Sequence, residues 1–189
     1  KADKAAITQF GNGVLLARIP LFLFQAVQAA LLPRLARLAA QGDFDEFTIG
    51  FRRLMVLVVG IGAFGTLGAL LVGAPIVDLV FDAQLTGRTM AMLALSSAIY
   101  MAAIATSQAV VALRGHQLVA AGWGVAVAAF VLATWLSSDL LFRRIEIGLV
   151  VSSLAALACF AVALRNRLAA GVDALVAHAG PLPELPLDG

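Results

Sequence analysis

The stretch that decides the fold is Leu54–Pro75, LMVLVVGIGAFGTLGALLVGAP, which contains no charged residue. It is longer than the ~20 residues that an α-helix needs to cross ~30 Å of hydrocarbon at ~1.5 Å per residue. Two more uncharged stretches of at least this length follow, at 89–113 and 115–138. Each of these stretches therefore predicts a transmembrane helix.

The composition of the 189-residue chain agrees with several such helices. Apolar residues make up 62% and charged residues 13%, and the mean hydropathy is +0.99. A soluble domain averages roughly half apolar and about a quarter charged residues, and a soluble fold of this size could not bury so much apolar surface. Soluble enzymes, nucleic-acid-binding proteins and disordered proteins are thus excluded. The net charge of +2 comes from scattered basic residues.

Two further apolar stretches each contain a charge, Arg18 in one and Glu146 in the other. We therefore predict an all-α, polytopic membrane helix bundle with five transmembrane helices, at about 13–33, 54–78, 89–113, 117–137 and 145–164. Residues 1–168 are assigned to this bundle. Residues 169–189 are predicted to form a short helix on the membrane surface and a disordered proline-rich tail.

The longest connection between spans carries the signals of a helix boundary. Gly42 suits a helix C-terminus, and Asp43 with Glu46 three residues later resembles a capping box. We expect a new helix to begin near Phe44 and to run continuously into the second span. Basic residues are slightly more frequent on this side of the predicted membrane, which by the positive-inside rule places Asp43 and the C-terminus in the cytoplasm. The basic residues are Arg34, Arg37, Arg52, Arg53, Arg114, Arg165 and Arg167 on this side, and Lys1, Lys4, Arg88, Arg143 and Arg144 on the other.

Polar residues inside the first span are candidates for a substrate path. Arg18 and Gln25 share one face of the predicted helix, and Gln28 borders that face. This face either lines a watery cavity, in which Arg18 meets an anionic group, or Arg18 extends along the helix to the lipid headgroups.

The third span carries a second polar stripe. Its members, at spacings of three, four and four residues, are Ser97, Tyr100, Ile104 and Gln108. They either line the same path or form hydrogen bonds to a neighbouring helix within the packed bundle. Small residues at every fourth position predict faces on which helices pack closely. These faces are Gly65, Ala69 and Gly73 in the second span, and Ala94, Ala98 and Ala102 in the third.

Catalysis finds no support in the spans. They contain no paired Ser and His, no facing aspartates and no His/Glu metal motif, and the chain has no P-loop. The single cysteine, Cys159, excludes an internal disulfide, and no Cys/His spacing indicates a metal site. We predict that the chain is not an enzyme and uses no cofactor or metal.

Several short motifs occur in a recognisable order. They are Phe10-Gly-Asn-Gly, an apolar helix with Pro20, the stretch Leu32–Asp43 with Pro33 and its Gly-Asp loop, the span end Ala74–Phe81, and the turn Val110–His116. This order resembles the second half of the oligosaccharide-lipid flippases, which belong to the multidrug/oligosaccharidyl-lipid/polysaccharide exporter superfamily. The resemblance covers roughly residues 10–168, although Asp82 stands where the family usually has Gly.

The resemblance implies a fold and a function. Family members have two bundles around a central cavity that opens alternately to either side of the membrane, and this chain would supply the last five spans of the second bundle. The chain begins at Lys1, and we expect it to be part of a longer protein that contains the first bundle.

The implied function is the flipping of a lipid-linked oligosaccharide across the bacterial cytoplasmic membrane for polysaccharide export. The implied partners are membrane lipid, the lipid-linked sugar and the missing bundle of the same protein. The path residues would be Arg18, Gln25, Gln28, Ser97, Tyr100 and Gln108. Two alternatives stay open. One is a MATE-type drug/ion antiporter, which the absence of a mid-span carboxylate disfavours, and the other is a membrane anchor or scaffold subunit that transports nothing.

Overall fold

The computed structural model describes residues 11, 14, 33–81, 85–137 and 141–179. This part of the chain is helical and contains no strand, which confirms the predicted all-α class. A helix over residues 33–41 precedes four long helices, which are α3 (Phe44–Phe81), α4 (Gly87–Ala112), α5 (His116–Leu136) and α6 (Leu141–Ala179). The first predicted span, apart from Val14 and Pro33, and the proline-rich tail lie outside the described residues.

The four long helices are each long and apolar enough to cross a membrane, over Phe44–Leu79, Gly87–Ala112, His116–Leu136 and Phe142–Val172. These segments match the last four predicted spans and extend beyond most of their ends. They are longer because a helix can continue past the hydrocarbon, where its arginines keep their charged heads in water. For the same reason α6 passes residue 168 without a break and ends at Ala179, so residues 169–179 continue this helix and are not a separate one.

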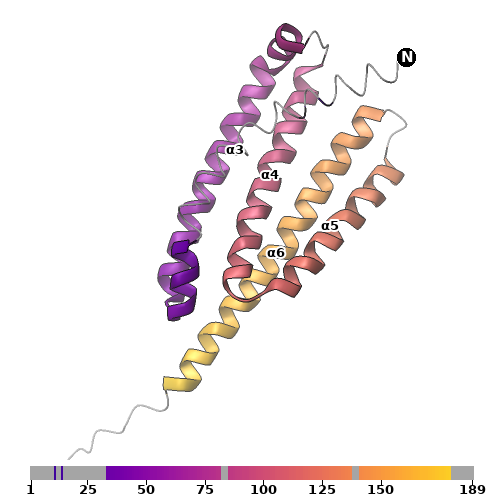
Figure 1. The fold of residues 1–189 in the computed structure, drawn as a ribbon. Helices are drawn as coiled ribbons and strands as arrows, with labels where there is room; N and C mark the ends of the chain where they lie inside the picture. The colour runs from indigo at the N-terminus through magenta and orange to yellow at the C-terminus, as the bar shows by residue number, and fades with distance from the viewer. Residues whose placement is uncertain (1–10, 12–13, 15–32, 82–84, 138–140, 180–189) are drawn as a thin grey trace, which may run out of the picture.

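The four helices pack side by side in the order α3–α4–α6–α5 (Figure 1). The two inner helices are α4 and α6, and the two edge helices are α3 and α5. Accordingly 56% of the most apolar 18-residue stretch of α4 is buried, whereas only 11% of the corresponding stretch is buried in α3 and in α5. The edge helices expose large apolar side chains such as Phe64 and Trp135. Surfaces of this kind suit contact with lipid or with further helices.

The predicted helix boundary before Phe44 is confirmed. Gly42 has φ 75°, the left-handed conformation that glycine readily adopts after a helix. Asp43 Oδ1 accepts a hydrogen bond from the Glu46 backbone N–H at 3.1 Å, as an N-cap residue does. The Glu46 side chain does not complete the capping box. Its Oε1 instead accepts a hydrogen bond from Arg34 Nη2 at 2.7 Å, which ties helix 33–41 to the first turn of α3.

Small residues bring α3 and α4 together. A Cβ added to Gly62 would lie 2.6 Å from the Ala98 Cβ, so the two backbones approach to a distance that only glycine permits. Ala98 belongs to the predicted small-residue face of α4. Gly73, from the predicted face of α3, packs against Met90 in the same way. The closest approach, at Gly62, falls outside the predicted face.

Consecutive long helices run in opposite directions, so their connections alternate between the two ends of the bundle (Figure 1). One end holds the start of α3, the turn between α4 and α5, and the last part of α6. Seven arginines belong to this end, and we call it the arginine-rich end: Arg34, Arg37, Arg52, Arg53, Arg114, Arg165 and Arg167. The opposite end holds Arg88, Arg143 and Arg144.

Candidate functional site

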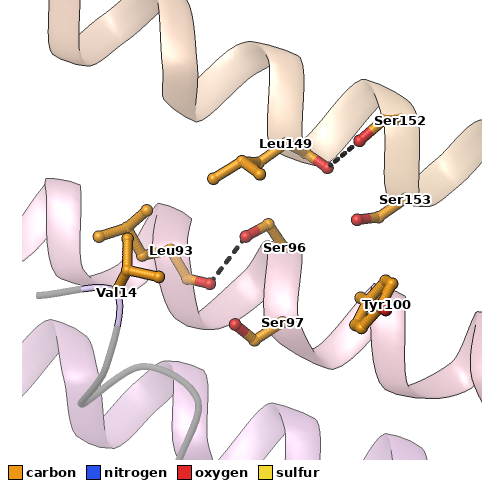
Figure 2. Close-up of a pocket in the computed structure, with 8 residues that line it drawn as sticks. All are labelled: Val14, Leu93, Ser96, Ser97, Tyr100, Leu149, Ser152 and Ser153. Carbon is orange, nitrogen blue, oxygen red and sulfur yellow. Dashed lines mark hydrogen bonds between the residues drawn. The ribbon is translucent and has the colours of Figure 1, made fainter. Parts of the chain in front are cut away.

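The candidate site is a cavity of about 180 Å³ between the two inner helices, α4 and α6 (Figure 2). Four serines and one tyrosine line it, together with three aliphatic residues. The described residues that line it are Leu93, Ser96, Ser97 and Tyr100 from α4, Leu149, Ser152 and Ser153 from α6, and Val14. A cavity of this size and polarity has room for water molecules or a small polar group. We call it the seam cavity.

Two serine hydroxyls of the seam cavity are engaged within their own helices. Ser96 Oγ donates a hydrogen bond to the Leu93 carbonyl at 2.8 Å, and Ser152 Oγ donates one to the Leu149 carbonyl at 3.1 Å (Figure 2). Such bonds satisfy the hydroxyl donor in an apolar environment. The oxygen of each hydroxyl still has capacity to accept a hydrogen bond from a bound group.

Three other hydroxyls in the seam cavity are uncommitted. The side chains of Ser97, Tyr100 and Ser153 make no hydrogen bond to another residue within the described ranges. Ser96 and Ser153 extend from the two inner helices into the space between them (Figure 2). The cavity therefore offers donors and acceptors, without a formal charge, to a polar group.

A second pocket of about 300 Å³ adjoins the seam cavity and shares Tyr100, Ser152 and Ser153 with it. Trp123 of α5 also lines this pocket. The ring centroids of Tyr100 and Trp123 are 5.7 Å apart, and the Trp123 ring meets Phe160 edge-on at 5.1 Å. These aromatic contacts hold the Tyr100 ring between the two pockets.

A buried carboxylate lies near the seam cavity on α6. Glu146 precedes Leu149 by three residues, which places the two on one helix face, and it is only 2% exposed. Its Oε2 lies 3.6 Å from Arg88 Nη2, an ion-pair distance too long for a hydrogen bond. Within the described part of the chain this oxygen has no hydrogen-bond partner.

The Arg88 side chain is 58% exposed, so the ion pair joins a buried anion to a solvent-accessible cation. A buried carboxylate with so little compensation is expensive. In a membrane helix such a group marks a functional position by default.

The structure brings together part of the predicted path. Ser97 and Tyr100 both line the seam cavity. Gln108 is half-buried two turns further along α4 and does not line the cavity. Arg18, Gln25 and Gln28 lie outside the described residues.

Sequence reasoning missed Ser96, the adjacent pair Ser152 and Ser153, and the burial of Glu146. A usable signal existed, because two consecutive serines and a carboxylate are unusual in an apolar membrane helix. The sequence contains no such signal for Trp123, because this residue of α5 belongs to the site only through its contact with the Tyr100 ring of α4.

Chemically, this arrangement suits the binding of a neutral polar group by hydroxyls, with one anion nearby. Among the described residues no group of three or more His, Cys, Asp and Glu side chains could hold a metal ion. No protein-family model, no characterised protein and no solved structure matches this chain.

Proposed function

We propose that this chain is part of a membrane transporter that moves the polar head of a lipid-linked oligosaccharide past the inner helices α4 and α6. The observation that carries the proposal is the seam cavity, which places five hydroxyl side chains between helices whose outer faces are apolar. Polar groups inside a membrane bundle are unfavourable unless they are satisfied or serve a polar ligand.

The chemistry of the cavity favours a sugar over a strongly charged substrate. Serine and tyrosine hydroxyls both donate and accept hydrogen bonds, as the hydroxyls of a sugar do. Tyr100 and Trp123 add aromatic surface beside these hydroxyls, and such rings contact the apolar face of a ligand well. The apolar outer surfaces of α3 and α5 allow a lipid tail to stay in hydrocarbon while the head moves.

A second candidate is an ion-coupled drug antiporter, and Glu146 favours it. A buried carboxylate beside a polar cavity can bind and release a cation as transport proceeds. The two candidates differ in their substrate, so a direct translocation assay separates them.

The test uses the complete natural gene product, reconstituted into vesicles that contain a fluorescent lipid-linked oligosaccharide. An impermeant lectin added outside reports how much sugar moves between leaflets. We expect translocation by the wild-type protein, and a strong reduction when Ser96 and Ser153 are both replaced by alanine.

The matched control is Ser107→Ala, on the same helix as Ser96. Ser107 is also buried and donates to a carbonyl of its own helix, that of Ile104, at 2.8 Å, but it does not line the seam cavity. Full activity of this control supports the proposal. Equal activity of the double variant and the control would refute a role for the cavity. Translocation of organic cations in place of the lipid would support the antiporter, and no transport of either would support an anchor or scaffold.

We also propose that the arginine-rich end faces the cytoplasm. The supporting observation is that this end holds seven arginines and the opposite end three within the described ranges. Cysteines at Asp43 and Ala83, in a chain whose Cys159 is replaced by serine, would be labelled on intact cells with an impermeant thiol reagent. We expect labelling at position 83 and protection at position 43; the reverse pattern would invert the topology.

A further inference from the structure

A polar pocket of about 350 Å³ lies at the arginine-rich end of the bundle. Its walls come from helix 33–41, the start of α3, the turn after α4 and the last part of α6. Arg114 and Arg167 line it, together with small or apolar residues that include Phe44 and Leu113. Among the described residues it shares no lining residue with the seam cavity. We call it the arginine pocket.

The backbone holds Arg114 at this pocket in an unusual conformation. Its φ is 59°, in the left-handed region that disfavours a side chain by about 1–2 kcal/mol. Two hydrogen bonds fix the turn, since the Arg114 N–H donates to the Val111 carbonyl and the Gly115 N–H donates to the Val110 carbonyl, both at 2.9 Å. Residues held in this region by their surroundings are frequent at functional sites.

Both guanidinium groups are available to a ligand. Neither Arg114 nor Arg167 forms an ion pair within the described part of the chain, and both are exposed. Arg34, at the same end, is by contrast paired with Glu46. A free guanidinium presents a planar set of donors that matches phosphate oxygens.

The position of the pocket determines which phosphate it meets. The apolar segment of α4 ends at Ala112, and that of α6 ends at Val172. The two arginines, one just past the end of α4 and one five residues before the end of the α6 segment, therefore lie at the level of the lipid headgroups.

We propose that the arginine pocket binds the headgroup of an anionic phospholipid. Arg114 and Arg167 contact the phosphate, and Phe44 and Leu113 contact the glycerol and the first acyl carbons. A free phosphate ion would use the arginines alone and gain nothing from the apolar wall. The inference does not depend on the proposed transport function.

The test is native mass spectrometry of the full chain in a neutral detergent, titrated with phosphatidylglycerol or phosphatidylcholine. We assign to each arginine that lines the pocket the gain of about fivefold that a basic residue provides against an anionic lipid surface. We therefore expect the Arg114→Gln/Arg167→Gln variant to bind phosphatidylglycerol roughly twenty-five-fold more weakly than the wild type. Arg167→Gln alone changes a residue within a regular helix and should weaken binding about fivefold. This single variant replaces the double variant as the test if the double variant loses its helical circular dichroism signal.

The matched control is Arg52→Gln/Arg53→Gln, which removes the same charge from two exposed arginines at the same end that lie outside the pocket. We expect this control to weaken binding less than about threefold. Three results would each overturn the proposal: equal losses in the two double variants, equal wild-type affinity for both lipids, or full displacement of phosphatidylglycerol by inorganic phosphate at constant ionic strength. The last would assign the pocket to a free anion.

Discussion

The contact between α5 and α6 depends on a glycine that no other residue can replace without a shift. A Cβ on Gly122 would overlap the ring of Phe160, with Cδ1 at 3.0 Å and Cε1 closer still. Carbon atoms normally pack at about 3.5–4.0 Å. Phe160 is fully buried and its ring is held edge-on against Trp123, so it has little space to move. Gly122→Ala should therefore push the two helices apart.

The magnitude follows from two opposing effects. Overpacking a tight contact costs about 1–3 kcal/mol, and replacing glycine by alanine in a helix returns about 0.5–1 kcal/mol. We expect Gly122→Ala to lower the free energy of unfolding by up to about 2.5 kcal/mol. Gly124→Ala is the matched control on the same helix. A Cβ there meets no atom of the described residues within 4 Å, so this variant should raise the free energy of unfolding by about 0.5–1 kcal/mol.

The assay is unfolding of the purified chain in mixed micelles with increasing dodecyl sulfate, followed by circular dichroism and tryptophan fluorescence. Trp135 is replaced by Phe in all variants, because it is 73% exposed and its removal leaves Trp123 as the only reporter. The fluorescence of native Trp123 should change in Gly122→Ala and stay unchanged in Gly124→Ala. Stability changes of the same sign in both variants would refute the close contact.

Two further predictions use the same unfolding assay. Arg88→Gln leaves the Glu146 carboxylate buried without its cation and should lower the free energy of unfolding by about 1–2 kcal/mol, a value reduced by the exposure of Arg88. Glu146→Gln removes the buried charge itself and should leave the free energy of unfolding unchanged or raise it. A lower free energy of unfolding for Glu146→Gln than for Arg88→Gln would contradict the ion pair. At the turn after α4, Gly115→Ala should destabilise the chain by about 2 kcal/mol, since the added Cβ overlaps Val110. Arg114→Gly should stabilise it by about 0.5–1 kcal/mol by relieving the left-handed conformation, and equal effects at both positions would show that the turn is built differently.

Features that depend on one helix at a time were predictable from the sequence. Uncharged length located three of the last four spans, because the width of the hydrocarbon sets the length of the apolar segment, and the last span was found as an apolar stretch that contains one charge, Glu146. The helix boundary at Gly42 and Asp43 was predictable for a similar reason, since capping uses only neighbouring residues.

Features that depend on two helices were not predictable in the same way. Gly62 and Gly65 look alike in the sequence, and only the position of Ala98 on α4 makes Gly62 the close contact. The turn after α4 shows the same limit, because glycine preference points to Gly115 for the left-handed position, whereas Arg114 occupies it. Gly115 is needed for space against Val110 instead. The candidate site shows the same difference. Tyr100 was predicted from the polar stripe of one helix, whereas Ser153 lines the same cavity only because α6 packs beside α4.

The spatial order α3–α4–α6–α5 differs from the order in which the helices are synthesised. When α5 leaves the ribosome, the helix against which it will pack has not yet been translated. The short turn around Arg114 joins α4 and α5 at one end, and in the folded bundle α6, a cylinder about 10 Å wide, lies between them. The contact between α5 and α6 can therefore form only after α6 has been translated, which makes it a late step of assembly. Until then Gly122, which faces the Phe160 ring in the folded bundle, lacks that partner.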